Sequence, residues 1–203
     1  MGRPMAHNLL RAGFELTVHS RSRPPVEELA AAGAKTADTP AECSRAAEVV
    51  VTMLPDGPDV DLVVAGSKGV FEGAQPGTLL VDMSTISPVS AKRLAAAAQS
   101  RGLSMLDAPV SGGEAGAINA QLSIMVGGER AAFDKAQPIF QALGSKITLL
   151  GEAGAGQLTK ACNQVMVAIN YLGMAEALAL GAKAGMDLGL LHQALAGGLA
   201  NSA

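Results

Sequence analysis

The sequence predicts an α/β fold, in which a Rossmann-like, doubly wound sheet is followed by the start of an all-helical domain. Short apolar runs that suit strands alternate with longer runs that suit helices, and the connections between them are short. This alternation is typical of a sheet whose strands are joined by crossover helices. After Leu150 the strand pattern stops and only helical patterns follow. We therefore expect two domains, 1–151 and 152–203, with a glycine-rich hinge at 151–156.

The first quarter of the chain is expected to hold two strands among three helices. Gly13 and Gly33 follow helical patterns at the positions where glycine commonly ends a helix. Thr39 followed by Pro40 is typical of a capping residue and the first residue of a helix. The run EVVVTML has the continuous apolar character of a strand buried on both faces of a parallel sheet. The expected elements are helices at 3–11, at 24–32 and from 40 onward, and strands at 14–19 and 48–54.

Residues 55–150 continue the alternation of strand and helix. The segment Pro55–Pro58 reads as a loop, because proline, aspartate and glycine favour turns. The expected elements are helices ending near 65, at 88–101 and at 131–143, and strands at 78–83, 103–108, 123–126 and 147–150.

Beyond residue 151 the sequence predicts one long helix and one short helix. The stretch between Gly154 and Gly185 contains no proline over about 28 residues, enough for a helix of roughly 40 Å. Its side chains are apolar around most of the circumference, which predicts a buried helix. A second helix is expected from Asp187, a suitable N-cap, to about Ala196.

The composition limits the possible partners and the compartment. The 203 residues are 49% hydrophobic and carry a net charge of −3, which is no footprint for nucleic acid or an anionic membrane. Cys43 and Cys162 have no metal-binding or disulfide spacing, and we expect buried thiols in a reducing cytosol. The most apolar window contains Asn170 and Glu176, and the N-terminus has no signal-peptide pattern. A cytoplasmic protein is therefore expected.

One polar stripe interrupts the long apolar helix. Its members, at helical spacing, are Gln157, Lys160, Asn163 and Gln164. The surroundings of such a lysine can lower its pKa, and the amine can then give or take a proton near neutrality. The competing interpretation is a lysine whose amine reaches water from a core helix. The three histidines lie in unrelated segments and are expected to be structural, so no metal site is predicted.

Two segments have the pattern of ligand-binding turns. Met1-Gly2 leads directly into a helix, as the last part of a phosphate-binding loop does, and Ser20-Arg21 follows at the distance expected of a ribose-binding position. Ser111, Gly112 and Gly113 come just after a strand and offer a hydroxyl and successive N–H groups to a carboxylate. The alternative for these glycines is a tight turn that merely requires them.

Taken together, the segments resemble the β-hydroxyacid dehydrogenase family, which includes 3-hydroxyisobutyrate dehydrogenase and tartronate semialdehyde reductase. They occur in the family's order over essentially the whole chain. The tail at 196–202 is similar to the tartronate semialdehyde reductase branch. The matching segments are Met1-Gly2, Met53-Leu54-Pro55, Asp82-Met83-Ser84-Thr85, 107–113 and 154–164.

The resemblance implies an NAD(P)-dependent oxidoreductase acting on a small acid with a hydroxyl β to its carboxylate. It implies Lys160 as the catalytic lysine, with Asn163 or Gln164 as its partner amide, and no metal. It places the substrate carboxylate at Ser111, Gly112 and Gly113, and homo-oligomer contacts in the helical domain. Arg21 favours NADP over NAD, because an arginine at this place can hold the 2′-phosphate. The implied cofactor-binding residues are Gly2, Ser20, Arg21, Met53, Leu54, Pro55 and Thr85.

The resemblance also leaves departures and alternatives. The family's first strand and phosphate-loop glycines are expected before Met1, and most of its helical domain after residue 203, so we expect the chain alone to be truncated and inactive. A phosphogluconate-type decarboxylating dehydrogenase would favour histidine-asparagine after the lysine, where this chain has Ala-Cys-Asn-Gln. An imine reductase is disfavoured, because members of that family generally lack a lysine at the position of Lys160. The remaining alternative is a catalytically inactive nucleotide-binding fragment.

Overall fold

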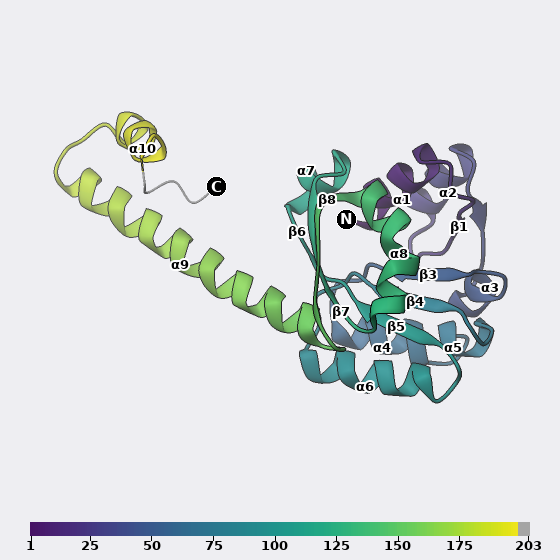
Figure 1. The fold of residues 1–203 in the computed structure, drawn as a ribbon. Helices are drawn as coiled ribbons and strands as arrows, with labels where there is room; N and C mark the ends of the chain where they lie inside the picture. The colour runs from purple at the N-terminus through teal and green to yellow at the C-terminus, as the bar shows by residue number, and fades with distance from the viewer. Residues whose placement is uncertain (199–203) are drawn as a thin grey trace. The chain divides into compact units, whose positions relative to one another are not determined.

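The computed structural model of the chain describes residues 1–198, which form two compact units (Figure 1). The first unit comprises residues 1–160, and the second begins at Ala161. Positions 199–202 of the tail, which carry the expected similarity to one branch of the family, lie outside the described residues.

The first unit contains a mixed six-stranded sheet with the order β3-β4-β5-β7-β6, in which β8 also pairs with β7. Strands β3, β4 and β5 are parallel, as the sequence predicts, while β7 runs antiparallel to β5 and β6. Strand β8 is parallel to β7. The bounds are β3 Val49–Thr52, β4 Leu79–Asp82, β5 Ser104–Asp107, β6 Val110–Ser111, β7 Leu122–Gly127 and β8 Gly144–Gly151.

A smaller parallel pair stands beside this sheet. It is formed by β1 (Thr17–Val18) and β2 (Lys35–Thr36). Strand β1 is shorter than the predicted strand at 14–19, and β2 was not predicted. Within residues 1–198 no strand joins the pair to the six-stranded sheet.

The helices of the first unit begin and end close to the predicted positions. Thr39 Oγ1 accepts a hydrogen bond from Glu42 N at 3.1 Å, so the predicted N-cap is confirmed. Gly13 and Gly33 have φ of +88° and +105°, which suits glycine after a helix. Two short helices, α5 and α7, were not predicted. The bounds are α1 Gly2–Arg11, α2 Arg23–Ala31, α3 Pro40–Ser44, α4 Gly57–Ala65, α5 Val70–Gly73, α6 Pro88–Gln99, α7 Gly113–Ile118 and α8 Arg130–Leu143.

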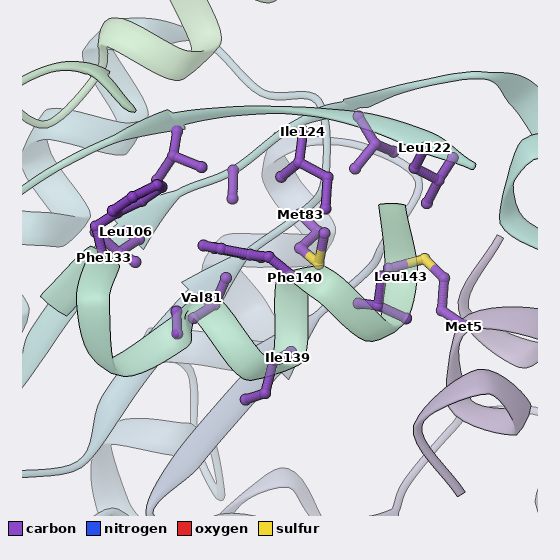
Figure 2. Packing of buried hydrophobic residues seen from close by; sticks show 14 of the residues in the cluster. Met5, Val81, Met83, Leu106, Leu122, Ile124, Phe133, Ile139, Phe140 and Leu143 are labelled. Atoms are coloured by element: carbon purple, nitrogen blue, oxygen red, sulfur yellow. The ribbon is translucent and has the colours of Figure 1, made fainter. Parts of the chain in front are cut away.

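Hydrophobic clusters cover both faces of the sheet. On one face, Phe140 of α8 lies in one buried cluster with Ile124 of β7 and with Met83, the residue after β4 (Figure 2). On the other face, Leu80 packs with Leu94 of α6 and with residues of α4. Strand β4 is therefore buried on both faces, as β-strands in doubly wound folds are. The same burial was expected of β3, but its three valines are only partly buried because β3 lies at an edge.

The long helix α9 (Ala155–Lys183) begins in the first unit and continues into the second, which also holds α10 (Leu188–Ala196). Asp187 caps α10 as predicted, since its Oδ1 accepts a hydrogen bond from Leu190 N at 2.9 Å. The prediction of a buried α9 is wrong for the described structure, and so is that of a buried Cys162 thiol. The exposed apolar side chains of α9 include Leu158, Val165, Met166, Ile169, Leu172 and Leu180.

Helix α9 has the length and composition of a membrane-crossing helix, although Asn170 and Glu176 within it predicted that it is not one. The same criteria are met by the core helices of soluble proteins, so this is weak evidence for a membrane location.

Replacing Phe140 by alanine tests whether the α8 face is the main core. The side chain is fully buried, so we expect Phe140→Ala to lower the free energy of unfolding by about 3–5 kcal/mol. The exposed Val89 serves as the control, because Val89→Ala should change stability by no more than about 0.5 kcal/mol. Urea unfolding followed by circular dichroism measures both, and equal losses in the two variants would contradict this assignment.

Candidate active site

The loops that follow β3 and β4 lie together at the carboxyl edge of the sheet. Thr52 and Asp82 are register partners on these strands, and Thr52 Oγ1 donates a hydrogen bond to Asp82 Oδ1 at 2.8 Å. In the loop after β3, Leu54 N donates a hydrogen bond to Ser84 Oγ at 2.9 Å. The structure thus brings Met53, Leu54 and Pro55 close to the turn that carries Thr85, which is exposed. Ligands of open α/β sheets bind at this edge.

The start of α1 reaches the same edge through Gly2. A Cβ placed on Gly2 would lie 3.7 Å from Met53 Cβ, which is an ordinary van der Waals contact. In the described chain, the first turn of α1 has neither a side-chain cap nor an acidic residue. The backbone N–H groups of such a helix start suit a phosphate group, so these residues fit a dinucleotide.

The predicted ribose-binding residues lie just after β1 and are exposed. Arg21 Nη1 lies 3.0 Å from Asp59 Oδ1, and Asp59 is in the first turn of α4. Ser20 Oγ accepts a hydrogen bond from Ser22 N at 3.3 Å. Because α4 follows the loop at Met53–Pro55, the ion pair links the Arg21 segment to the helix after that loop.

The start of α9 is bound to the carboxylate of Asp107, which ends β5. Asp107 Oδ1 accepts a hydrogen bond from Gly154 N at 2.6 Å, and Oδ2 accepts one from Gln157 N at 2.8 Å. Sequence reasoning included Asp107 in a matching segment but missed this role. A signal was present, because an acid that ends a buried strand requires N–H partners and helix starts provide them.

Gln157, the first member of the predicted polar stripe, is fully buried at the start of α9. Its side chain is 1% exposed, and its amide reaches the turn after β4. Nε2 donates to Ser84 O at 2.8 Å, and Ile86 N donates to Oε1 at 3.0 Å. The amide therefore holds the backbone on both sides of Thr85.

Lys160 follows Gln157 by three residues on α9 and is partly buried. Burial lowers the pKa of its amine from the ordinary lysine value, since removing water disfavours the charged form. Further along the same helix, Asn163 is partly buried and Gln164 is exposed. A pKa lowered in this way increases the fraction of neutral amine at a given pH.

The segment Ser111–Gly113, which the sequence predicted as a carboxylate-binding turn, leads from β6 into the short helix α7. Gly112 and Gly113 have φ of +133° and +61°, so the backbone conformation favours glycine at both positions. A side chain at Gly112 would also approach Leu122 Cδ2 to 3.3 Å. The structural need for these glycines is therefore explained, while the hydroxyl of Ser111 is left partly exposed.

Two buried carboxyl groups lie side by side at this edge. Asp82 and Asp107 are register partners on β4 and β5. Burial is the main cause that raises the pKa of each, and it outweighs the hydrogen bonds that Asp82 accepts from Ser84 and Thr52. Among the described residues, Asp82 Oδ2 has no hydrogen-bond partner.

Comparison with known families gives two matches that divide the chain. Residues 1–151 match the family described as the NAD binding domain of 6-phosphogluconate dehydrogenase. Residues 154–203 match the family described as the NAD-binding region of NADP-dependent 3-hydroxyisobutyrate dehydrogenase.

Individual relatives are similar over nearly the whole chain. A 2-hydroxy-3-oxopropionate reductase of Escherichia coli is 45% identical over 202 residues, covering 100% of this chain and 69% of the relative. An NAD-dependent L-serine dehydrogenase of Pseudomonas aeruginosa is 45% identical over 193 residues, covering 95% and 65%. A solved 3-hydroxyisobutyrate dehydrogenase of Mycobacterium tuberculosis with L-serine aligns with a TM-score of 0.89 at 37% identity, covering 99% of this chain and 68% of that one.

The raised pKa of Asp82 predicts a stability that depends on pH. A carboxyl group whose pKa is raised on folding binds a proton more tightly in the folded state, so it stabilises the fold at low pH. This contribution is lost as pH rises from about 3.9, the unfolded value, through the raised folded value. We expect Asp82→Asn to reduce the decline in unfolding free energy over this range.

Urea unfolding at a series of pH values measures this decline. Thr52→Val should act in the opposite direction, because it removes a hydroxyl that donates to Asp82 and favours the ionised form. Parallel stability curves for Asp82→Asn and the parent chain would show that Asp82 does not titrate differently on folding.

Proposed function

The chain belongs to the 3-hydroxyisobutyrate dehydrogenase family of NAD(P)-dependent oxidoreductases, and from that premise we propose that its protein interconverts a small 3-hydroxy acid and the corresponding semialdehyde. Lys160 acts as the general acid and base. The observation that carries this proposal is a partly buried lysine on a helix whose first turn is bonded to the strand ends where the cofactor loops lie.

The domain division that accompanies this proposal is 1–151 for the dinucleotide-binding domain and 152–203 for the helical region. It is supported by the two family matches, which meet between residues 151 and 154. Lys160 then belongs to the helix that leads out of the dinucleotide-binding domain.

The dinucleotide is held at the carboxyl edge of the sheet. Gly2 supplies its backbone N–H at the start of α1, and Ser20 and Arg21 bind the adenosine ribose and its 2′-phosphate. When bound, the nicotinamide supplies or accepts the hydride. The residues that contact the rest of the cofactor are Met53, Leu54, Pro55 and Thr85.

The proton is transferred by Lys160. In the direction of reduction its ammonium donates a proton to the oxygen that develops negative charge, and in oxidation the neutral amine accepts the hydroxyl proton. A pKa lowered by burial increases the fraction of neutral amine near neutral pH. Asn163 or Gln164 orients the amine.

The substrate carboxylate binds at Ser111, Gly112 and Gly113. Holding one end of a short acid at this segment places its hydroxyl or aldehyde against the lysine, which replaces random encounter by alignment. The relatives named above support a small 3-hydroxy acid as the substrate class, because 2-hydroxy-3-oxopropionate and L-serine both carry oxygen on the carbon β to a carboxylate.

The active protein is further proposed to be a cytoplasmic homo-oligomer. The support is the row of exposed apolar side chains on α9, since an apolar surface of this extent marks an interface. The relatives are named as dehydrogenases and reductases, which favours protein rather than lipid as the cover of this helix.

Lys160→Ala tests the acid–base assignment. We expect turnover to fall by at least ~10²-fold with unchanged cofactor affinity, because a proton-transfer group is lost while the cofactor edge stays intact. In the oxidative direction, the parent enzyme should gain kcat/KM as pH rises through the lowered pKa of Lys160, and the variant should not. Steady-state kinetics in the complete enzyme measure both. Lys183→Ala, on the exposed last turn of the same helix, is the control, and retained turnover in Lys160→Ala would overturn the assignment.

Arg21→Ala tests the cofactor preference. The guanidinium is expected to bind the 2′-phosphate, so the variant should lose at least ~10-fold in NADP affinity with little change for NAD. Titration of both cofactors by fluorescence gives the two dissociation constants. Arg23→Ala is the matched control, because Arg23 is similarly exposed in the same segment. An equal loss for NAD and NADP would assign Arg21 to a different role.

A further inference from the structure

The first turn of α9 approaches two strands so closely that side chains are excluded. A Cβ on Gly156 would lie 2.4 Å from Met125 O and 2.9 Å from Asp107 Oδ2. A Cβ on Gly127 would lie 2.6 Å from Asp107 Oδ1 and 2.7 Å from Gly156 N. Real Cβ atoms do not come this close to backbone, so β5, β7 and the start of α9 are packed at a fixed separation.

The residues immediately before α9 do not by themselves direct the helix. Gly151 and Gly154 have φ of +152° and +89°, which are conformations that glycine adopts freely. The direction of the first turn is instead determined by side chains that reach it from elsewhere. The Asp107 carboxylate holds its backbone at Gly154 and Gln157, and the amide of Gln157 holds the turn after β4.

The bonds of Gln157 differ from those of an ordinary buried amide because of what they connect. Its oxygen and nitrogen bind Ile86 N and Ser84 O, the two groups on either side of Thr85. Lys160 lies three residues further along the helix, a rise of about 4.5 Å. One side chain therefore joins the turn proposed to contact the cofactor to the helix turn that carries the amine.

We propose that Gln157 is a positioning residue for the reaction, whose amide sets the separation between the Thr85 turn and Lys160. The proposal rests on the assignment of Lys160 as the acid–base group. Hydride and proton transfer both require reacting atoms in a narrow range of geometry, and a displacement of about 1 Å can cost ~10²-fold in rate. A helix connected to its sheet through glycines needs such a connection to keep that geometry.

The test replaces Gln157 by methionine in the complete enzyme. Gln157→Met keeps the length of the side chain, removes both hydrogen bonds and introduces no charge that would act on Lys160 directly. The matched control is Asn8→Leu. Asn8 is also a buried amide on a helix, and its Nδ2 donates to Ala117 O at 2.7 Å, away from the turn after β4. Each change removes one buried amide, so a general loss of stability should appear in both.

Two measurements separate positioning from stability. The first is kcat per cofactor-binding site, counted by titration, together with the cofactor dissociation constant. We expect Gln157→Met to lower kcat at least ~10-fold while the dissociation constant stays within about 3-fold, and Asn8→Leu to change neither. The second is the pH dependence with which Lys160 is acetylated in the protein, measured by competitive labelling and mass spectrometry.

Labelling reports on Lys160 without requiring catalysis. Loss of the two Gln157 hydrogen bonds should admit water to the amine of Lys160. The lowered pKa of Lys160 should then return toward the ordinary lysine value in Gln157→Met and not in Asn8→Leu. If Gln157→Met does not fold, Gln157→Asn, which is one methylene too short to make both bonds, should show the same changes.

An unchanged kcat per site with unchanged labelling, or equal changes in Asn8→Leu, would overturn the positioning role. This outcome is distinct from failure of the proposed function, which would show as retained turnover in Lys160→Ala. If Lys160→Ala retains turnover, a labelling change confined to the Gln157 variants would still show that Gln157 positions the turn that carries Lys160.

Discussion

The carboxylate of Asp107 is the interaction on which the position of α9 depends. It ends β5 inside the sheet and binds two N–H groups of the helix start, Gly154 N and Gln157 N. Burying a carboxylate is unfavourable unless it is bonded, and unpaired N–H groups at a helix start are unfavourable unless they are capped. Each group lowers the cost of burying the other. The short distances around Gly127 and Gly156 show that this pairing leaves no space for side chains.

The same edge of the sheet contains buried polar groups that are unfavourable for stability and that the hydrophobic core compensates. Asp82 and Asp107 are buried neighbours with raised pKa, and an oxygen of Asp82 has no partner within the described chain. Strand β4, buried on both faces between two hydrophobic clusters, carries Asp82 and the turn that follows it. Functional sites often contain such strained or desolvated groups, because the surrounding fold supplies the stability that they consume. The proposed site lies where this cost is concentrated.

The candidate residues fall into two sets that the structure treats differently. One set lies at a single edge of the sheet because β3 and β4 are parallel and in register, and it comprises Gly2, Met53, Leu54, Pro55 and Thr85. Arg21 is linked to that edge through its ion pair with Asp59. Ser111, Gly112 and Gly113 form the entry to a short helix, where positive φ explains the glycines without reference to a ligand. Lys160 is connected to the first set by Gln157, which the helical spacing had placed on the same polar stripe as the lysine.

Local sequence patterns were enough to predict the order of most elements, the caps at Thr39 and Asp187, the glycines that end α1 and α2, and the family motifs. These features depend on periodicity or on hydrogen bonds between residues three or four apart, so they are present in any local stretch. The partners of the Gln157 amide and of Asp107, and the faces of β3 and α9 that are covered, depend instead on long-range packing. The partners of Gln157 and Asp107 lie 47 to 73 residues away. No spacing rule encodes such pairs, because folding brings them together only after the strands have paired and the helices have packed.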